Sequence, residues 1–358
     1  MVAAAPCAIG GPKKAALKKL SSSSVKLTDV AALAGVSASA VSRAFTQGAS
    51  VSPATRQMVE RAAAKLGYEP SLIARSLATN KTKLVGLVAD NFRNPAFMEV
   101  FDLYTRALQA RELRPLLVNL AGEADARAAI RLMRQYRIDG VIVATSTLPS
   151  AFVRGFLDAG LSVVHAFGRG GPRPPFDVVG VDNVAAGALA ARTLVERGYR
   201  SVAFLGGPEK ATSTIDRAKG FVAGLNAAGL APARMTFASA YDYEAGFDAM
   251  GPLLAARGLD ALFCGDDLIA MGALDALRAV GRRAPDDMGV LGFDGVDLAG
   301  WRSYALTTIR QPFADIIRTS VEAVIDAIEH PARAARTVTF PCRLVERGTL
   351  RPLNAKSR

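Results

Sequence analysis

The sequence is poor in cysteine and histidine, and it has no long apolar run. Its 358 residues include three cysteines and two histidines. Cys7, Cys264 and Cys342 lie far apart, without a CxxC pair, which argues against a disulfide framework and a zinc site and fits a reducing cytoplasm. No apolar run of roughly 18 residues predicts a membrane span, and the first residues do not have the pattern of a signal peptide. We therefore expect a cytoplasmic protein that uses no metal ion and no other cofactor.

Catalytic motifs are missing as well. The sequence contains no GxSxG, no P-loop and no GxGxxG after a predicted strand. His165 lies inside an apolar strand pattern, where a histidine is usually a core residue, and His330 lies at a predicted helix end. Asp266 and Asp267 are adjacent in sequence, so they would not converge as an acid and base pair. We therefore expect that the protein is not an enzyme.

Acidic residues are scarce in the N-terminal part of the chain. Residues 1–83 contain twelve lysines and arginines but three acids, whereas the remaining 275 residues are nearly neutral. Neutralisation of phosphates is the main sequence-independent source of affinity for nucleic acid, so this asymmetry favours a basic nucleic-acid-binding module joined to an ordinary globular body. Residues 1–24 are expected to form a basic, disordered tail.

Residues 25–70 carry three helical patterns separated by tight turns, as in "LTDVAALAGVSASAVSRAF". Gly35 ends the first pattern, Ser37 is a predicted N-cap of the second, and Ser52 with Pro53 begins a third that Gly67 ends. Apolar residues recur at helical spacing at Val30, Ala31, Leu33 and Ala34, then at Val41, Ala44 and Phe45, and finally at Val59, Ala62 and Leu66. This predicts a helix-turn-helix, although a three-helix packing unit would give a similar pattern.

The outward face of the second helix is the predicted DNA-reading surface. It presents Ala38, Ser39, Ser42 and Arg43. Of these, only Arg43 can make a bidentate contact to guanine, while Ser39 can donate or accept and Ala38 can only contact a thymine methyl group. Such a helix discriminates few bases.

Residues 71–82 form a separate segment between the helices and the body. In "EPSLIARSLATNKTK", Ser71 can cap a short helix on which Ile73 and Leu77 are one turn apart. Helices of fewer than about 12 residues are marginal alone, so this one would fold only when DNA and a second copy hold it; a flexible linker is the alternative.

From Lys83 the sequence alternates short β-rich runs with helix-sized segments. Ten such runs occur, the first at "KLVGLVAD" and the tenth at "ALTTIRQP". This alternation is typical of parallel βαβ sheets covered on both faces, and ten strands favour two doubly wound halves. The ligand of such a fold lies at the carboxyl ends of the strands, in the cleft between the halves.

These patterns together resemble the lactose-repressor/galactose-repressor (LacI/GalR) family of bacterial transcription regulators. The similarity begins at "LTDVAALAGVSASAVSRAF", continues through "VSPATRQMVERAAAKLGYEPSLIARSLATNKTKLVGLV", and reaches "GVLGFDGVDLAG" and "LTTIRQP", so that it covers about residues 25–350. The resemblance implies a small all-α helix-turn-helix head and an α/β periplasmic-binding-protein-like core of two doubly wound parallel-sheet lobes. It also implies a homodimer that binds a near-palindromic double-stranded DNA operator.

The resemblance implies further assignments in the hinge and the core. Leu77 corresponds to the leucine that the family inserts into the minor groove, with Ala74 and Arg75 beside it on the hinge helix; such a wedge kinks the duplex. The effector-binding and dimerisation domain would span 83–355, with crossovers near Asp182, Gln311 and residue 330. Lobe 1 would then comprise about 83–182 and 311–330, and lobe 2 about 183–310 and 331–355.

The same resemblance implies an effector site in the cleft. Arg217 corresponds to the family's ligand-clamping arginine, whose planar fork suits a diol, a carboxylate or a phosphate. Phe167 stands where some family members have an aspartate. The complete expected set is Ala96, Phe97, Phe167, Ser213, Arg217, Tyr241, Asp266 and Asp294. Some of these residues have a purely structural interpretation as well. Phe97 is equally suited to a position in the hydrophobic core, and Asp267, or Asp266, is suited to the N-cap of a helix.

The sequence therefore predicts a DNA-binding regulator, most simply a repressor, controlled by a sugar or sugar acid. Two departures concern DNA: Ala38 and Ser39 are small where the family varies to choose operators, and Lys26 replaces a threonine common ahead of the first helix. A solute-binding protein and a corepressor-dependent regulator responding to a nucleobase are the alternatives.

Overall fold

The computed structural model describes residues 25–46, 48–70, 76, 81–90, 92, 94–120, 126–148, 150–171 and 173–353. The chain divides into two compact units between Asn80 and Lys81. None of the helices within these ranges is both long enough and apolar enough to cross a membrane.

The N-terminal unit contains three helices, α1 (Leu27–Ala34), α2 (Ala38–Ala44) and α3 (Pro53–Leu66). Gly35 and Gly67 end α1 and α3 in the left-handed conformation, with φ of 66° and 65°. Ser37 caps α2 by accepting from the Ala40 amide at 3.2 Å, and Ser52 caps α3 by accepting from the Thr55 amide at 3.1 Å. The predicted helix boundaries are confirmed.

The core of this unit is formed by Val30, Val41 and Val59, which are fully buried, together with small alanines. Leu33 was predicted on the core face of α1, and this prediction is wrong because its side chain is 45% exposed. The apolar stripe of α1 runs instead through Leu27, Val30 and residues one turn further, and Leu33 lies beside it.

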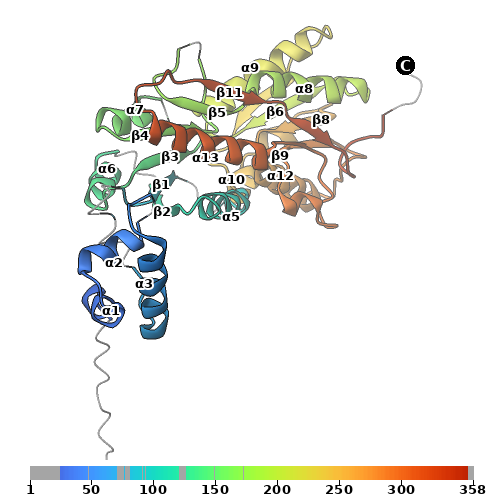
Figure 1. The fold of residues 1–358 in the computed structure, drawn as a ribbon. Coiled ribbons are helices and arrows are strands. Elements are labelled where there is room, and N and C mark those ends of the chain that lie inside the picture. The colour runs from blue at the N-terminus through green and yellow to red at the C-terminus, as the bar shows by residue number, and fades with distance from the viewer. Residues whose placement is uncertain are drawn as a thin grey trace, which may run out of the picture. The chain divides into compact units, whose positions relative to one another are not determined.

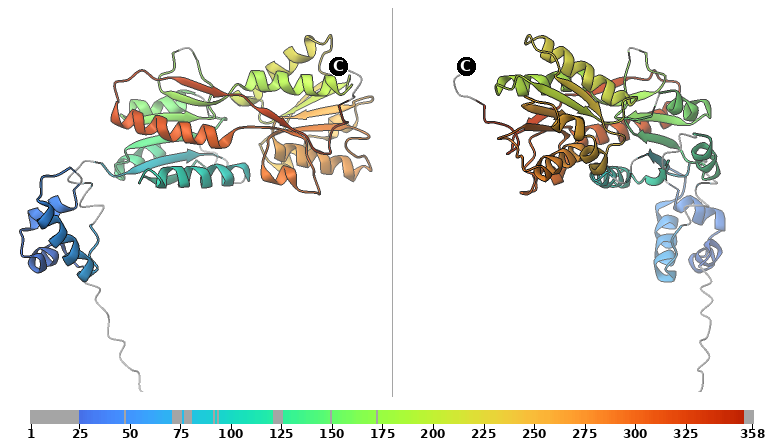
Figure 2. Two further views of the ribbon diagram at one scale, coloured as in Figure 1. Left: turned by 45° about the vertical axis from the view of Figure 1, so that its right-hand side comes forward. Right: turned by 180° about the vertical axis from the view of Figure 1, so that it is seen from behind.

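The C-terminal unit contains two six-stranded sheets in two lobes (Figures 1 and 2). Lobe 1 has the order β11-β5-β4-β3-β1-β2, and all its strand pairs are parallel. Its strands are β1 (Leu84–Ala89), β2 (Arg114–Asn119), β3 (Gly140–Ala144), β4 (Ser162–Ala166), β5 (Asp177–Val181) and β11 (Thr337–Phe340). They are covered by α5 (Ala96–Gln109), α6 (Ala126–Gln135), α7 (Ser150–Asp158) and α13 (Phe313–Glu329).

Lobe 2 repeats this architecture with the order β12-β10-β9-β8-β6-β7, and only its edge strand β12 is antiparallel to its neighbour. Its strands are β6 (Val202–Gly206), β7 (Arg234–Phe237), β8 (Ala261–Cys264), β9 (Gly289–Asp294), β10 (Thr308–Arg310) and β12 (Arg343–Val345). Its helices are α8 (Asn183–Glu196), α9 (Thr212–Asn226), α10 (Tyr243–Asp248), α11 (Gly251–Leu254), α12 (Asp267–Ala279) and the 3₁₀ helix η1 (Asp297–Gly300).

All ten predicted strands are present, and the fold class is confirmed. Two further strands, β11 and β12, were not predicted. The third crossover was expected near residue 330, but it follows Phe340, because β11 adds to lobe 1 beside β5 before the chain returns to lobe 2. The last short segment of lobe 1 was thus assigned to the wrong lobe.

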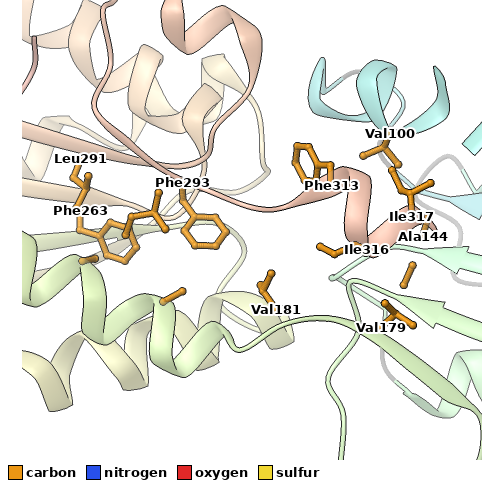
Figure 3. Close-up of a cluster of buried hydrophobic side chains, with 14 of the residues drawn as sticks. Val100, Ala144, Val179, Val181, Phe263, Leu291, Phe293, Phe313, Ile316 and Ile317 are labelled. Atoms are coloured by element: carbon orange, nitrogen blue, oxygen red, sulfur yellow. The ribbon is translucent and has the colours of Figure 1, made fainter. Parts of the chain in front are cut away.

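A continuous apolar core joins the lobes near the crossovers. Figure 3 shows Phe263, Leu291 and Phe293 of lobe 2 on one side and Phe313, Ile316 and other residues of lobe 1 on the other. The lobes are therefore connected by packed side chains at the crossovers, and the strand ends of both sheets face a common cleft.

Candidate functional site: a DNA-reading helix and an interlobe cavity

The outward face of α2 is exposed as predicted. Ala38, Ser39, Ser42 and Arg43 are all exposed, while Val41 and Ala44 are buried. The Ser39 hydroxyl lies 3.0 Å from that of the cap residue Ser37. A face with one long side chain among small ones can lie close to the floor of a groove. The hinge residues predicted to contact DNA, Ala74, Arg75 and Leu77, lie outside the described residues.

The second candidate site is a cavity between the lobes of the C-terminal unit. It measures about 660 Å³, counted as all space free of atoms and including its open mouth. Its lining includes seven of the eight predicted effector residues, namely Ala96, Phe97, Phe167, Arg217, Tyr241, Asp266 and Asp294. It also includes residues that the sequence had not singled out for this role: Asp90, Asn94, Val100, Thr145, Ser146, Thr147, Val181, Asn183, Gln311 and Phe313. Polar and aromatic side chains therefore converge on one cavity between the lobes.

Arg217 is held rigidly at the cavity wall. It is 4% exposed, its Nε donates to Asn183 Oδ1 at 2.8 Å, and its Nη1 donates to the Gly265 carbonyl at 2.5 Å. The guanidinium carbon lies 3.6 Å from the centroid of the Phe293 ring, which is a cation–π contact. Gly187 of α8 permits this arrangement, since a Cβ there would come within 2.1 Å of the Arg217 carbonyl oxygen.

Asp266 and Asp294 bring two buried carboxyl groups to the same wall. Asp294 accepts from Gln311 Nε2 at 2.6 Å, and the two aspartates are hydrogen-bonded to each other. Burial raises the pKa of Asp294 well above its ordinary value, and Asp266 raises it further, while Arg217 opposes the rise. Burial likewise raises the pKa of Asp266. A shared proton between the two carboxyl groups follows, because two adjacent buried charges repel.

The backbone of Asp294 is strained. Its φ is 110°, a region that side chains with a Cβ rarely adopt. The backbone N–H of Gln311 donates to the backbone carbonyl of Asp294 at 3.0 Å and helps to fix this conformation. Strained residues cluster at ligand sites, where the surrounding structure holds a side chain in a position that regular backbone would not give.

Asp267 has a different role from the one expected. The N-cap of α12 is Asp266, which accepts from the Leu268 amide at 2.7 Å, so the expectation that Asp267 caps this helix is wrong. Asp267 accepts instead from the Gly295 and Val296 amides at 2.8 and 2.9 Å. It therefore anchors the loop that follows Asp294.

Tyr241 and Ser213 form a supporting pair. The Tyr241 hydroxyl lies 2.8 Å from the Ser213 hydroxyl and 2.6 Å from that of Thr214. Its ring packs on Gly207, where a Cβ would come within 2.3 Å. Ser213 was predicted to contact the effector, but it does not line the cavity: it is 1% exposed, because its hydroxyl is turned toward Tyr241 and Ser146. Ser213 thus positions Tyr241.

Aromatic residues of lobe 1 form the opposite wall. Phe97 is half-buried and packs on Phe101 with the ring centroids 5.8 Å apart. Phe167 meets Phe313 edge to face at 6.0 Å. Its φ of 63° is again one that favours glycine, which turns its ring into the cleft lining. His165, behind this wall, is 1% exposed, and burial lowers its pKa to about 4, as suits a neutral core residue.

Several polar contacts join the lobes around the cavity. Asn94 of lobe 1 donates from Nδ2 to Asp266 Oδ2 at 3.0 Å. Arg169 of lobe 1 makes two hydrogen bonds of 2.7 Å to the Asp216 carboxylate on α9. Thr212 at the start of α9 donates to the Ser146 carbonyl at 3.0 Å. These contacts therefore tie the two lobes together around the cavity.

Both units resemble known protein families. Residues 26–71 match the description "Bacterial regulatory proteins, lacI family", and residues 191–350 match "Periplasmic binding protein-like domain". The HTH-type transcriptional repressor PurR of Erwinia tasmaniensis is 32% identical over 325 residues, which cover 90% of this chain and 95% of that protein. The PurR repressor of Photorhabdus laumondii is 32% identical over 326 residues, with the same coverage of each chain.

Several solved structures of regulators are similar to this chain over most of its length. A transcriptional regulator CelR–cellobiose complex is 28% identical with a TM-score of 0.69, covering 91% of this chain and 99% of that one. A LacI-family regulator from Silicibacter pomeroyi is 29% identical with a TM-score of 0.73, covering 92% and 100%. A lac repressor dimer bound to operator and an anti-inducer has a TM-score of 0.81 at 24% identity, covering 91% and 98%, and shows the same fold.

The fold, the helix-turn-helix head and these relatives define a DNA-binding transcriptional regulator with a periplasmic-binding-protein-like body. The chain belongs to the LacI family of bacterial regulatory proteins. Like the relatives named above, it is a repressor rather than an enzyme.

Proposed function

We propose that this repressor binds a near-palindromic operator as a homodimer and that a small molecule in the interlobe cavity controls its affinity for DNA. The observation that carries the proposal is the cavity itself. It brings Arg217, Asp266 and Asp294 of lobe 2 against Phe97 and other residues of lobe 1, so a bound ligand would stabilise one arrangement of the lobes.

A sugar or sugar acid is the effector class that the lining favours. Two carboxyl groups and a guanidinium beside aromatic side chains form the polar ring and stacking wall that a pyranose or furanose needs. The cellobiose complex of a 28% identical regulator supports this class. A purine nucleobase acting as corepressor is the second candidate, supported by the relatives named PurR and by two aromatic side chains in the lining, Phe97 and Phe167.

The signal would pass from the cavity to DNA through the position of the lobes. Effector binding shifts the lobe arrangement, and this changes the spacing of the paired hinges in the dimer, so that hinge helices form or unfold. A coupling free energy of about 1–3 kcal/mol is ordinary for such a change.

The test uses the full chain and the promoter DNA of its own gene. Fluorescence anisotropy should show binding that falls steeply between roughly 50 and 200 mM salt. A thermal-shift screen of sugars, sugar acids and nucleobases follows, and each compound that raises the melting temperature is added to the DNA titration. The proposal is contradicted if the protein ignores that DNA with and without every such compound.

A further inference from the structure

The charged groups that line the cavity are unequal in number. Among the described lining residues, three are aspartates, Asp90 from lobe 1 and Asp266 and Asp294 from lobe 2, and one is a cation, Arg217. Even with one proton shared between Asp266 and Asp294, the four groups retain an excess of one negative charge. A cavity of this kind attracts a cation, admits a neutral ligand and opposes an anion.

Arg217 can compensate for an anionic ligand only in part. Its Nε and Nη1 are engaged by Asn183 and the Gly265 carbonyl, and its flat face is covered by Phe293. The positive charge of Arg217 already acts on the carboxyl group of Asp294, since it opposes the rise in the pKa of that group. A carboxylate or phosphate placed beside Arg217 would therefore also lie beside Asp294.

Asp90 shows where a ligand donor is missing. It directly follows β1, and one of its carboxylate oxygens, Oδ2, accepts from the Thr147 hydroxyl. The other oxygen, Oδ1, is buried and has no hydrogen-bond partner within the part of the chain that the structure describes. A buried acceptor left unpaired destabilises the fold, and more so when it is charged, so a donor from a ligand would offset this penalty.

We propose that the cavity selects an uncharged or cationic ligand rich in hydrogen-bond donors, one of which binds Asp90 Oδ1, and that it rejects anions. Within the effector class of the proposed function, on which this inference rests, it favours a neutral or amino sugar over a sugar acid or sugar phosphate. Asp90 then contacts the ligand from lobe 1 while Asp294 contacts it from lobe 2, and the ligand links the lobes.

Matched probes test the selectivity by charge. The full chain is titrated with glucose, glucosamine, glucuronate and glucose 6-phosphate, and with the corresponding galactose and ribose sets, and the shift in melting temperature is measured. We expect shifts from neutral or amino members only. A larger shift from an acid or a phosphate than from its neutral partner overturns the inference, and so does the absence of any shift from all neutral and amino members.

A variant tests Asp90 itself. Asp90→Asn keeps the shape and an oxygen for Thr147 but places an amide donor where the ligand donor would lie. We expect at least a ten-fold loss of affinity for the neutral or amino probe that binds, with no fall in the melting temperature of the unliganded protein. Asp102→Asn is the matched control, because Asp102 is an exposed residue of lobe 1 that pairs with Arg106 on α5; it should change neither quantity.

The outcomes separate this inference from the proposed function. An anionic compound that binds and alters operator affinity overturns the selectivity proposed here and leaves effector control standing. A fall in the melting temperature of unliganded Asp90→Asn, with unchanged probe affinity, would mean that Asp90 is structural and overturns its role. If no compound alters operator affinity, effector control fails, whatever the probes reveal about charge.

Discussion

The guanidinium of Arg169 donates two hydrogen bonds of 2.7 Å to the Asp216 carboxylate of the other lobe. Arg169 follows β4 in lobe 1, whereas Asp216 belongs to α9 in lobe 2, one residue before Arg217. The arginine also donates to the Thr212 carbonyl at 3.2 Å. This ion pair therefore joins lobe 1 to α9, the helix that carries Arg217.

Arg169→Ala is expected to loosen the contact between the lobes. Because the arginine side chain is 43% exposed, solvent screens the pair, and the loss should be about 1 kcal/mol, or roughly five-fold in effector affinity. Isothermal titration with the effector measures it. Arg106→Ala removes an ion pair within α5 alone and is the control that should leave affinity unchanged. An equal loss of effector affinity in both variants would contradict a role of the Arg169–Asp216 pair in holding the lobes together.

The buried carboxyl groups predict a pH-dependent stability. The pKa of Asp294 is raised above its ordinary value of 3.8, and that of Asp267 is raised to about 7 by burial. The folded protein therefore keeps protons on these two carboxyl groups that the unfolded chain has released, so their contribution to stability is fully present at low pH and is lost as the pH rises through the raised values. His165, whose pKa burial lowers to about 4, acts in the opposite direction below its ordinary value of 6.5. Asp294→Asn should reduce the slope of stability against pH that the carboxyl groups produce, by up to about 1.4 kcal/mol per pH unit.

Urea unfolding of the unliganded protein at pH values between about 5 and 8 measures that slope. Asp267 is unchanged in Asp294→Asn and should maintain part of the slope of stability against pH. Asp102→Asn, at an exposed ion pair, should follow the original protein at every pH. Because His165 titrates alike in both proteins, an identical slope in Asp294→Asn and in the original protein would contradict a proton held between Asp266 and Asp294.

Arg43→Ala should weaken operator binding more than any other single truncation on α2. It is the only long side chain on the exposed face, so its loss removes about 1–3 kcal/mol of base discrimination, or roughly 5- to 150-fold in affinity. Binding to operator and to random DNA is compared by anisotropy. Lys65→Ala, at the exposed end of α3, removes one positive charge elsewhere and should weaken both DNAs alike or neither. Equal effects of Arg43→Ala on both DNAs would reduce Arg43 to a phosphate contact.

Much of the architecture could be predicted from the sequence because its signals are local. Strand cores such as β3 and β9 read as apolar runs, and the capping residues Ser37, Ser52 and Gly67 mark helix ends directly. The strands β11 and β12 were not predicted, because they are short, half-exposed edge strands whose partners are distant in sequence.

The site was harder to predict at the points where backbone conformation decides. Asp266 has extended backbone angles and Asp267 helical ones, so only the former can cap α12. Ser213 is drawn away from the cavity by the Tyr241 hydroxyl from another segment. Asp90 had a signal, a carboxylate directly after a buried strand, but its unpaired oxygen becomes visible only once Thr147 binds the other one.

Separate substitutions should divide DNA binding from effector binding. Arg217→Ala removes a buried side chain that touches the cavity, so effector affinity should fall at least ten-fold while operator binding without effector persists. Leu77→Ala, at the hinge position expected to insert into the minor groove, should weaken operator binding and leave effector affinity intact. Anisotropy and calorimetry on both variants measure the two affinities. If each substitution changed both affinities equally, the head and the cavity would not act as separate binding sites joined by the hinge, and the two-state coupling proposed above would fail.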